Sequence, residues 1–320
     1  MQSIQALIKT NFEQVDQVIN EQLSSDVPLV EQISEYIVQS GGKRLRPVLV
    51  LLSCGVLNNL NKDSASLAAA IEFLHTATLL HDDVVDTSDM RRGRSTANHK
   101  WGNAPSVLVG DFLYARSFEL LVSLRNMDVM ECLSQATRVI AEGEVMQLTN
   151  IGNVNLTQEQ YYAVIYAKTA KLFEASCVSA AMLNYAGPKQ IEALIEYGKQ
   201  LGLAFQLVDD VLDYTGDASV MGKNVGDDLA EGKATLPLIY CLAHAQQDQK
   251  NLIKRAIINE GLEDLEQIIQ IIQDTGAIEY SIEQAKQAGQ KACDALSVFE
   301  SNPYKDALLR LVDVAIDRVS

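Results

Sequence analysis

Apolar residues recur along much of this chain at the spacing of an amphipathic helix. Residues 67–85 place apolar side chains at positions 67, 70, 71, 74 and 85, and residues 194–212 place them at 194, 197, 201, 205, 208 and 212. Such spacing gathers these side chains on one helix face. We find no sustained alternation bounded by hairpin turns, and no Asn-Gly or Asp-Gly dipeptide occurs. The pattern predicts an all-α bundle.

The six prolines leave long stretches uninterrupted, which permits long helices. Pro47, Pro105 and Pro188 each stand where a proline is able to open a helix at its first turn. Residues 215–232 are rich in Gly, Asp and Asn, and this composition predicts a long loop. Because no linker or sharp change of composition divides the chain, we expect residues 1–320 to form a single domain.

The chain is acidic, with a formal net charge of −16 at pH 7. A nucleic acid or an anionic membrane surface would be repelled, so we expect no nucleic-acid partner. An anionic small molecule would have to meet local basic residues or a bound metal. The five cysteines are scattered and include no C-x-x-C pair, which is typical of reduced core residues in a cytoplasmic protein.

Neither export nor membrane insertion is expected. Residues 1–20 mix Gln, Asn, Asp and Glu with apolar residues and contain no basic region followed by a hydrophobic one. The longest apolar run, residues 48–57, is too short to cross a bilayer and fits a buried helix. We therefore predict a cytoplasmic location.

Two copies of an Asp-Asp-x-x-Asp motif carry most of the chemical information. Residues three and four apart share a helix face, so each copy forms a wall of like charges that destabilises an isolated helix. A hard divalent cation would neutralise this charge, and carboxylates suit Mg²⁺, which commonly bridges them to substrate phosphates. The first copy comprises Asp82, Asp83 and Asp86, and the second comprises Asp209, Asp210 and Asp213.

Basic residues concentrate near these acidic motifs and at one glycine turn. The turn at residues 41–47 holds Lys43, Arg44 and Arg46 before a helix, an arrangement that presents backbone N–H groups and cations to an anion. One basic group is therefore able to hold a bare diphosphate, while the carboxylates hold a second diphosphate through metal. The other basic residues are Arg91, Arg92 and Arg94 after the first motif, and Lys223 and Lys233 after the second.

Each feature has a plainer interpretation when it is taken alone. A single Asp-Asp-x-x-Asp motif also fits a solvated helix face or an N-terminal turn, and a lone Lys-Arg-x-Arg more often marks a surface patch. A helical histidine such as His81 more often makes a structural hydrogen bond than it binds metal or acts as a base. Two acidic motifs after apolar runs, with three basic groups, are not easily explained by coincidence.

These residues resemble the motifs of the trans-polyprenyl diphosphate synthases, which condense isopentenyl diphosphate with an allylic diphosphate. The resemblance spans roughly residues 30–320 and implies the isoprenoid synthase fold, a bundle of long, mostly antiparallel helices around a central cavity, in a homodimer. Residues 71–78 are especially similar to the bacterial octaprenyl branch, which makes the ubiquinone side chain. The matching segments are residues 42–47, His75, 79–86, 89–93, Lys168-Thr169, 205–213, 222–228 and 232–233.

The resemblance also implies roles for individual residues. Three Mg²⁺ ions would be ligated by Asp82, Asp86 and Asp209, with Asp83, Asp210 and Asp213 in support. Isopentenyl diphosphate would be held by Lys43, Arg46, His75 and Arg92. The allylic diphosphate would be held by Arg91, Lys168, Thr169, Gln206, Lys223 and Lys233, and dipoles from Lys168, Thr169 and Gln206 would face the allylic carbocation.

Helix geometry suggests which residues control product length. Thr78, Ala77 and Leu74 lie one turn and more before Asp82 on its own face, so they would line the path beneath the metal. The small side chain of Ala77 leaves room for a long chain. The resemblance favours farnesyl diphosphate as primer and an octaprenyl product for the ubiquinone or menaquinone side chain, with transient membrane contact for release. Nonaprenyl (solanesyl) and shorter products remain open.

Three other functions compete with this one. A terpene cyclase would normally replace the second Asp motif with an Asn/Ser/Glu-type motif and would not need Lys43 and Arg46. A non-catalytic partner subunit of a heteromeric prenyl synthase would lose aspartates that this chain keeps. A helical divalent-metal buffer would have no use for the basic groups, and its Mg²⁺ affinity would not rise with diphosphate.

Overall fold

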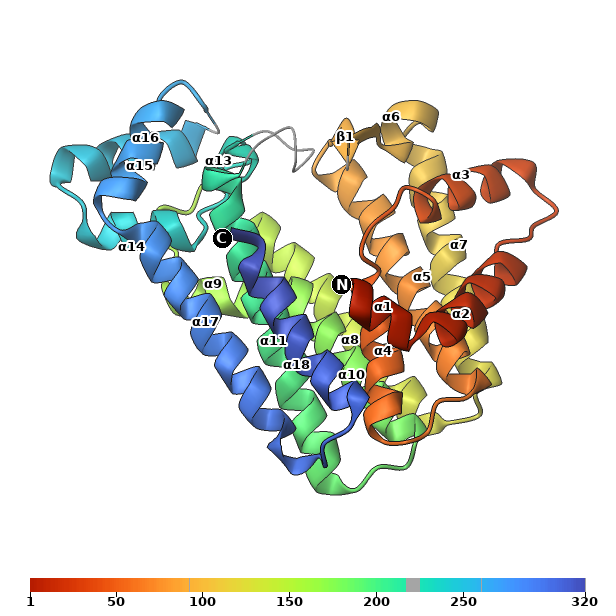
Figure 1. The fold of residues 1–320 in the computed structure, drawn as a ribbon. Coiled ribbons are helices and arrows are strands. Elements are labelled where there is room, and N and C mark those ends of the chain that lie inside the picture. The colour runs from red at the N-terminus through yellow and green to blue at the C-terminus, as the bar shows by residue number, and fades with distance from the viewer. Residues whose placement is uncertain (92, 217–224, 260, 320) are drawn as a thin grey trace. The chain divides into compact units, whose positions relative to one another are not determined.

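The computed structural model describes residues 1–91, 93–216, 225–259 and 261–319, and most of their regular structure is helical (Figure 1). The strands within these ranges are β1 (Met90–Arg91) and β2 (Arg94–Ser95), which pair antiparallel with Met90 opposite Ser95. The predicted all-α class is confirmed. Within the same ranges, no helix has the length and apolar character needed to cross a bilayer.

The chain divides into two compact units. Unit 1 comprises Met1–Thr137, Leu172–Gly198 and Ala295–Leu311, and unit 2 comprises Arg138–Lys171, Lys199–Asp294 and Val312–Ser320. The expectation of a single domain over residues 1–320 stays a prediction.

Unit 1 is organised around one long helix, α5 (Lys62–Val85), which packs against α7, α4 and α2. Asn61 caps its start by accepting hydrogen bonds from the backbone N–H groups of Asp63 and Ser64. The helix is apolar almost all round, which is why it forms the core of the unit. The other helices that lie in unit 1 are α1 (Gln2–Leu7), α2 (Lys9–Gln22), α3 (Pro28–Val38), α4 (Leu45–Val56), α6 (Ala97–Trp101), α7 (Asn103–Ser123) and η2 (Leu296–Val298).

A small aromatic and cationic cluster holds the β1–β2 hairpin within unit 1. The Tyr36 hydroxyl donates a hydrogen bond to the Ser95 carbonyl at 2.7 Å. The Tyr36 ring meets the Trp101 ring edge-on, and the Lys100 ammonium lies 4.3 Å from the Trp101 ring centroid. These contacts fix the segment that follows the first Asp motif.

Unit 2 contains a local departure from α-helical geometry. Helix α9 (Gln158–Ile165) continues into a π-helical turn, η1 (Tyr166–Ala170), and the chain then enters α10 (Lys171–Leu183), which belongs to unit 1 except for Lys171. Such turns occur frequently at functional sites. The other elements within unit 2 are α13 (Asp227–Ala230), α14 (Leu236–His244), α15 (Gln247–Asn259), α16 (Leu265–Asp274), α17 (Ala277–Ala295, whose last residue belongs to unit 1) and η3 (Asp317–Val319).

Helices that contribute several residues to both units include α8 (Met127–Thr149), α11 (Pro188–Thr215) and α18 (Pro303–Ile316). Helix α11 begins at Pro188, while Pro47 and Pro105 lie in the first turns of α4 and α7. The three helix starts predicted from proline are therefore confirmed. The predicted loop at residues 215–232 contains the short α13, and its residues 217–224 lie outside the described ranges.

Candidate functional site

The first Asp motif lies at the carboxyl end of α5. Asp82 and Asp83 belong to its last turn and Asp86 is its C-cap, and this turn contains no basic residue. The helix dipole places partial negative charge at this end, so the three carboxylates are in an unfavourable position unless cations compensate them. This location excludes the N-terminal-turn interpretation, in which the dipole would have stabilised them.

Asp83 is turned into the protein, whereas its neighbours are not fully buried. Its side chain is 0% exposed, and the Arg91 Nε atom donates a hydrogen bond to its Oδ1 atom at 2.7 Å. The Asn98 amide donates to the Asp83 carbonyl at 3.1 Å. Asp82 and Asp86 are half-buried. The two carboxylates predicted as ligands are thus the accessible ones of this motif.

The second Asp motif occupies the last two turns of α11, again with no basic residue in the last turn. Asp210 and Asp213 are buried, with 3% and 6% of their surface exposed. The Asp209 side chain is 41% exposed, and its Oδ1 atom lies 2.9 Å from the guanidinium of Arg318. Arg318 also lies over the Phe205 ring at 4.8 Å. As in the first motif, the predicted ligand Asp209 is the accessible carboxylate.

Neutral donors hold the buried Asp210. The Tyr161 hydroxyl donates to its Oδ2 atom at 2.5 Å, and the Gln206 amide donates to its Oδ1 atom at 2.7 Å. Burial, with a further contribution from the charge of Asp228, raises the pKa of the Asp210 carboxyl to about 8. Both causes disfavour negative charge here, and a nearby cation would relieve them.

The π-helical turn η1 presents two of the predicted allylic-site residues. The Lys168 ammonium lies 2.9 Å from Glu144, and the Thr169 hydroxyl donates to the Gln206 side-chain oxygen at 2.8 Å. Gly143 lets α8 approach this turn closely, since a Cβ atom there would lie 2.8 Å from the Lys168 backbone nitrogen. Thr169 and Gln206 are therefore in direct contact, and Lys168 is held by an acid on α8.

The glycine turn before α4 divides its cations between two uses. Gly41 and Gly42 have positive φ angles of 82° and 130°. Arg44 forms an ion pair with Asp16 and lies 4.0 Å from Glu72, so it stabilises unit 1 from within. Arg46, in contrast, lies 3.1 Å from the His75 Nε2 atom.

The structure thus brings Arg46 and His75 together, as the predicted isopentenyl diphosphate site requires. The Arg46 guanidinium also stacks over the Phe173 ring at 4.7 Å. Lys43 lies on the glycine turn three residues before Arg46. Lys233 forms an ion pair with Glu231. Arg92 and Lys223, which were also predicted to bind diphosphate, lie outside the described residues.

The residues predicted to control product length lie on α5 ahead of the first motif. Leu74 and Ala77 are 1% and 0% exposed, and Thr78 is half-buried with its hydroxyl donating to the His75 carbonyl. His81 lies 3.2 Å from the Val107 carbonyl of α7. This contact favours the structural interpretation of His81.

Two contacts in unit 2 were not predicted from the sequence. Arg318 reaches Asp209 from the end of the described chain, and Tyr161 reaches Asp210 from α9. Arg318 is an isolated basic residue, so no neighbouring motif indicated this contact. Tyr161 belongs to a Tyr-Tyr pair in an amphipathic segment, which by itself indicates only a helix.

The donor set fits a hard divalent ion. In unit 1, Asp82 and Asp86 supply accessible carboxylate oxygens, the ligands that Mg²⁺ prefers, and in unit 2 Asp209 supplies the same. Among the described residues, no three His, Cys, Asp or Glu side chains form a ready-made metal cage. Mg²⁺ usually keeps several waters and binds through one or two carboxylates with substrate phosphates, so it does not need such a cage.

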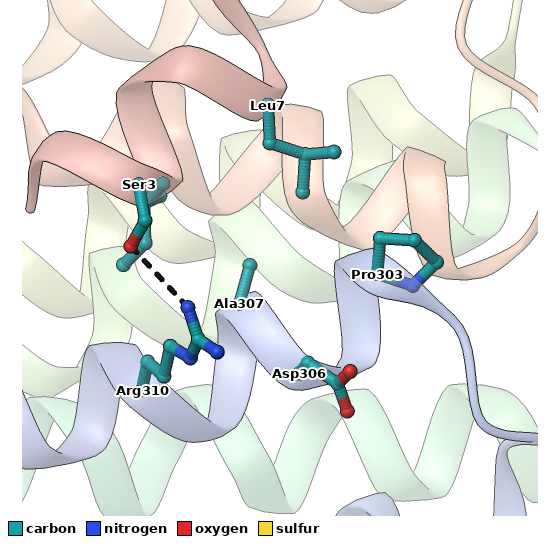
Figure 2. A pocket seen from close by; sticks show the side chains of 7 residues that line it. Ser3, Leu7, Pro303, Asp306, Ala307 and Arg310 are labelled. Atoms are coloured by element: carbon teal, nitrogen blue, oxygen red, sulfur yellow. Dashed lines mark hydrogen bonds between the residues drawn. The ribbon is translucent and has the colours of Figure 1, made fainter.

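A separate pocket lies in unit 1, where α1 meets the first turns of α18 (Figure 2). Its volume is about 180 Å³, and its lining includes Ser3, Leu7, Pro303 and Arg310. The Arg310 guanidinium donates a hydrogen bond to the Ser3 hydroxyl at 3.4 Å. None of the residues predicted for catalysis or diphosphate binding lines this pocket.

The chain is similar in sequence to known prenyl synthases over nearly its whole length. Octaprenyl diphosphate synthase of Haemophilus influenzae is 46% identical, over 98% of this chain and 96% of that protein. The geranyl-diphosphate-specific all-trans-nonaprenyl-diphosphate synthase of Rhodobacter capsulatus is 47% identical, over 99% of this chain and 98% of that protein.

The fold is also that of a solved prenyl synthase. Polyprenyl synthase of Caulobacter crescentus, crystallised with calcium and isoprenyl diphosphate, has a TM-score of 0.96 and 42% identity, over 100% of this chain and 98% of that one. This agreement confirms the isoprenoid synthase fold. Residues 27–274 match the family model described as polyprenyl synthetase. The chain therefore belongs to the polyprenyl synthetase family, and it is a prenyltransferase.

Proposed function

We propose that this prenyltransferase extends farnesyl diphosphate by successive condensation with isopentenyl diphosphate to an all-trans octaprenyl diphosphate. The observation that carries the proposal is the division of labour within the two Asp motifs. In each motif the predicted ligands are accessible at a helix carboxyl end, while Asp83, Asp210 and Asp213 are buried. An acidic motif with only a structural role would not need to place carboxylates at the negative end of a helix dipole, and this chain does so twice.

Three carboxylates, Asp82, Asp86 and Asp209, would hold Mg²⁺ with the allylic diphosphate. When bound, the metal supplies charge stabilisation for the departing diphosphate. The Caulobacter crescentus relative, which was crystallised with calcium and isoprenyl diphosphate, supports a divalent ion in this role. By the family resemblance we propose three such ions.

The protein's own side chains then orient the two substrates. Lys43, Arg46, His75 and Arg92 hold isopentenyl diphosphate, and the contact between Arg46 and His75 supports this grouping. Thr169 and Gln206 direct their oxygen dipoles at the allylic carbocation, and fixed dipoles of this kind act without reorganisation during the reaction. Arg91, Lys168, Lys223 and Lys233 balance the charge of the allylic diphosphate, which also takes up the proton that is lost.

We place the chain-length determinant on α5. Ala77 is fully buried more than one turn before Asp82, and Leu74 is buried more than two turns before it, so a larger side chain at residue 77 would shorten the room for product. Octaprenyl and nonaprenyl synthases stand at similar identity to this chain. We favour eight units because residues 71–78 match the octaprenyl pattern, and we keep nine as the alternative.

The remaining parts of the proposal concern the protein's setting. The product would supply a quinone side chain, ubiquinone or menaquinone, from an enzyme in the cytoplasm that meets the membrane transiently when it releases the lipid. We also propose a homodimer. Leu108 and Val122 on α7 support it, because these apolar side chains are 66% and 64% exposed and would be covered in an isologous interface.

Incubation of the purified full chain with Mg²⁺, labelled isopentenyl diphosphate and farnesyl diphosphate tests the function directly. We expect Mg²⁺-dependent formation of labelled chains that co-migrate with an octaprenyl standard after dephosphorylation. A nonaprenyl product would select the alternative. If no chain longer than the primer forms while Mg²⁺ binds equally with or without diphosphate, the chain is a metal buffer and the proposal is wrong.

A further inference from the structure

A chain of hydrogen bonds in unit 2, partly buried at Gln206 and buried at Asp210, joins Thr169 and Tyr161 to the second Asp motif. The Thr169 hydroxyl donates to the Gln206 side-chain oxygen, and the Gln206 amide nitrogen donates to Asp210 Oδ1. The Tyr161 hydroxyl closes the chain on Asp210 Oδ2. Both oxygens of Asp210 are thus engaged by side chains, and the Gln206 carboxamide is oriented from both of its ends.

Tyr161 is built as a hydrogen-bond donor at this position. Its side chain belongs to a buried apolar cluster that includes Leu207 and Val208 of α11, which fixes the ring. Burial first, and then the neighbouring charge of Asp210, raise the pKa of the Tyr161 hydroxyl well above its ordinary value. The hydroxyl therefore keeps its proton and is the donor in its hydrogen bond to Asp210 Oδ2.

Removal of the Tyr161 hydroxyl would change the orientation of Asp210 and, through it, of Gln206. Asp210 is 3% exposed, so water does not readily replace the lost donor at Oδ2. The carboxylate would turn toward another donor and weaken its bond to Gln206. An amide has nearly the same shape at its two ends, so Gln206 without this anchor is able to flip and present nitrogen where oxygen stood.

We propose that Tyr161 is a positioning residue for the allylic diphosphate site, acting through Asp210 to fix the Gln206 carboxamide and the second Asp motif. This inference rests on the proposed function, because it assigns Gln206 and Asp209 to that substrate. It adds a residue outside every motif that the sequence singled out. Its effect is confined to the allylic substrate, since the residues predicted to bind isopentenyl diphosphate take no part in the network.

The next residue in the chain supplies a matched control. Tyr162 shares α9 with Tyr161 and also loses only a hydroxyl when it becomes Phe, but its hydroxyl lies 3.4 Å from Gln284 and not near Asp210. A general effect of Tyr→Phe substitution on α9 would appear in both variants. A positioning effect would appear only in Tyr161→Phe.

The test titrates the full chain with Mg²⁺ and inorganic diphosphate and uses the shift in melting temperature as the measure of binding. The KM of each substrate is then measured separately. We expect Tyr161→Phe to weaken Mg²⁺–diphosphate binding about tenfold and to raise the KM of farnesyl diphosphate similarly. The KM of isopentenyl diphosphate should change less than about twofold, as should every value for Tyr162→Phe. Equal behaviour of the two variants in the diphosphate titration would overturn the proposal.

A double-mutant cycle establishes the route of the effect. In the Asp210→Asn background, addition of Tyr161→Phe should change diphosphate binding by less than about twofold, because the carboxyl group to which the hydroxyl donates is already absent. Fully additive effects would show that Tyr161 does not act through Asp210. If Tyr161→Phe alone does not fold, the double variant should fold, since both partners of the bond are then weakened together. Failure of both to fold would likewise contradict the proposal.

The titration also separates this inference from the proposed function. Binding of inorganic diphosphate needs no turnover. A wild-type protein that makes no polyprenyl product would refute the function, while the comparison of Tyr161→Phe with Tyr162→Phe would still give its own result.

Discussion

The carboxyl ends of α5 and α11 solve the same electrostatic problem with different chemistry. At α5 the buried carboxylate, Asp83, is matched by a permanent cation, Arg91, from the hairpin that follows. At α11 the buried carboxylate, Asp210, is held by a tyrosine hydroxyl and an amide, and the cation Arg318 goes instead to the accessible Asp209. The first arrangement neutralises the charge of the buried carboxylate, whereas the second only fixes the orientation of the carboxyl group. Asp210 accordingly has a raised pKa.

This difference separates stability from function. A charged pair whose acid is fully buried contributes strongly to folding, because its loss leaves a carboxylate poorly solvated. Neutral donors contribute less to folding but fix the direction of the groups they touch. We therefore expect damage to the α5 end to lower stability more, and damage to the α11 network to change substrate affinity more.

The largest effect should come from the accessible carboxylates, where the two ends are expected to behave alike. Asp82→Asn and Asp209→Asn should each lower kcat at least about a thousandfold, because each removes charge that would hold the metal with the leaving group. Single-turnover assays at saturating substrate measure this. Asp63→Asn, at the opposite end of α5, is the control and should retain wild-type activity. Loss at only one of the two aspartates would break the symmetry between the motifs.

Product length should depend on α5 and shift in whole isoprene units. Ala77→Tyr should end elongation well before the octaprenyl stage, because an aromatic ring at a fully buried position more than one turn before Asp82 fills the path of the chain. Ala77→Val should give an intermediate distribution. Chromatographic sizing of the dephosphorylated products distinguishes these outcomes. An unchanged distribution in Ala77→Tyr would remove α5 from the tunnel.

Stability should respond to the charged pair more than to the neutral one. Arg91→Gln should lower the free energy of unfolding by about 2–3 kcal/mol, because the buried Asp83 loses the guanidinium that donates to its Oδ1 atom. Tyr161→Phe should lower it by about 1–2 kcal/mol. Urea denaturation of the metal-free protein gives both values.

An exposed pair provides the reference for this comparison. Arg138 and Glu142 form an i,i+4 ion pair whose side chains are 63% and 58% exposed, so Arg138→Gln should cost less than about 0.5 kcal/mol. If Arg91→Gln costs no more than Arg138→Gln, the pairing of Asp83 is not the stabilising contact described here.

The smallest effect concerns thiol reactivity, which checks that the interior around α4 and α10 is closed. Burial raises the pKa of the Cys54 thiol to about 11 and that of Cys177 to about 12. At pH 8 roughly a thousandth or less of each is thiolate, so both should resist a thiol reagent in the native protein and react after unfolding. Cys132 and Cys293, which are partly exposed, should react first. Mass spectrometry of the labelled peptides identifies the order.

Local features of the fold were predictable from the sequence. Periodic apolar residues before Asp82 and Asp209 predicted helices that the structure confirms as α5 and α11, and Pro188 marked the start of α11. These signals are local, because helix periodicity and proline geometry act within a few turns. The predicted loop from residue 215 placed the second motif at the end of its helix, and Gly216 directly follows α11. The position of the first motif at the carboxyl end of α5 was not predicted, since no glycine follows it before Gly93.

The division of labour among similar residues was not predictable. Arg44 and Arg46 are equivalent in sequence, yet Arg44 turns to Asp16 while Arg46 meets His75. The π-helical turn that carries Lys168 and Thr169 has no distinctive sequence signal. The contacts of Tyr161 and Arg318 join distant parts of the chain and depend on tertiary packing. The catalytic roles assigned from the family resemblance stay predictions.

The packing of Trp101 gives the protein an intrinsic optical probe. It is the single tryptophan of the chain, and its ring contacts both the Tyr36 ring and the Lys100 ammonium, in the cluster that holds the hairpin from which Arg91 reaches Asp83. Its emission will report on that segment without any attached dye. A stopped-flow trace of this fluorescence after mixing with diphosphate and metal would time the rearrangement around the first motif apart from chemistry.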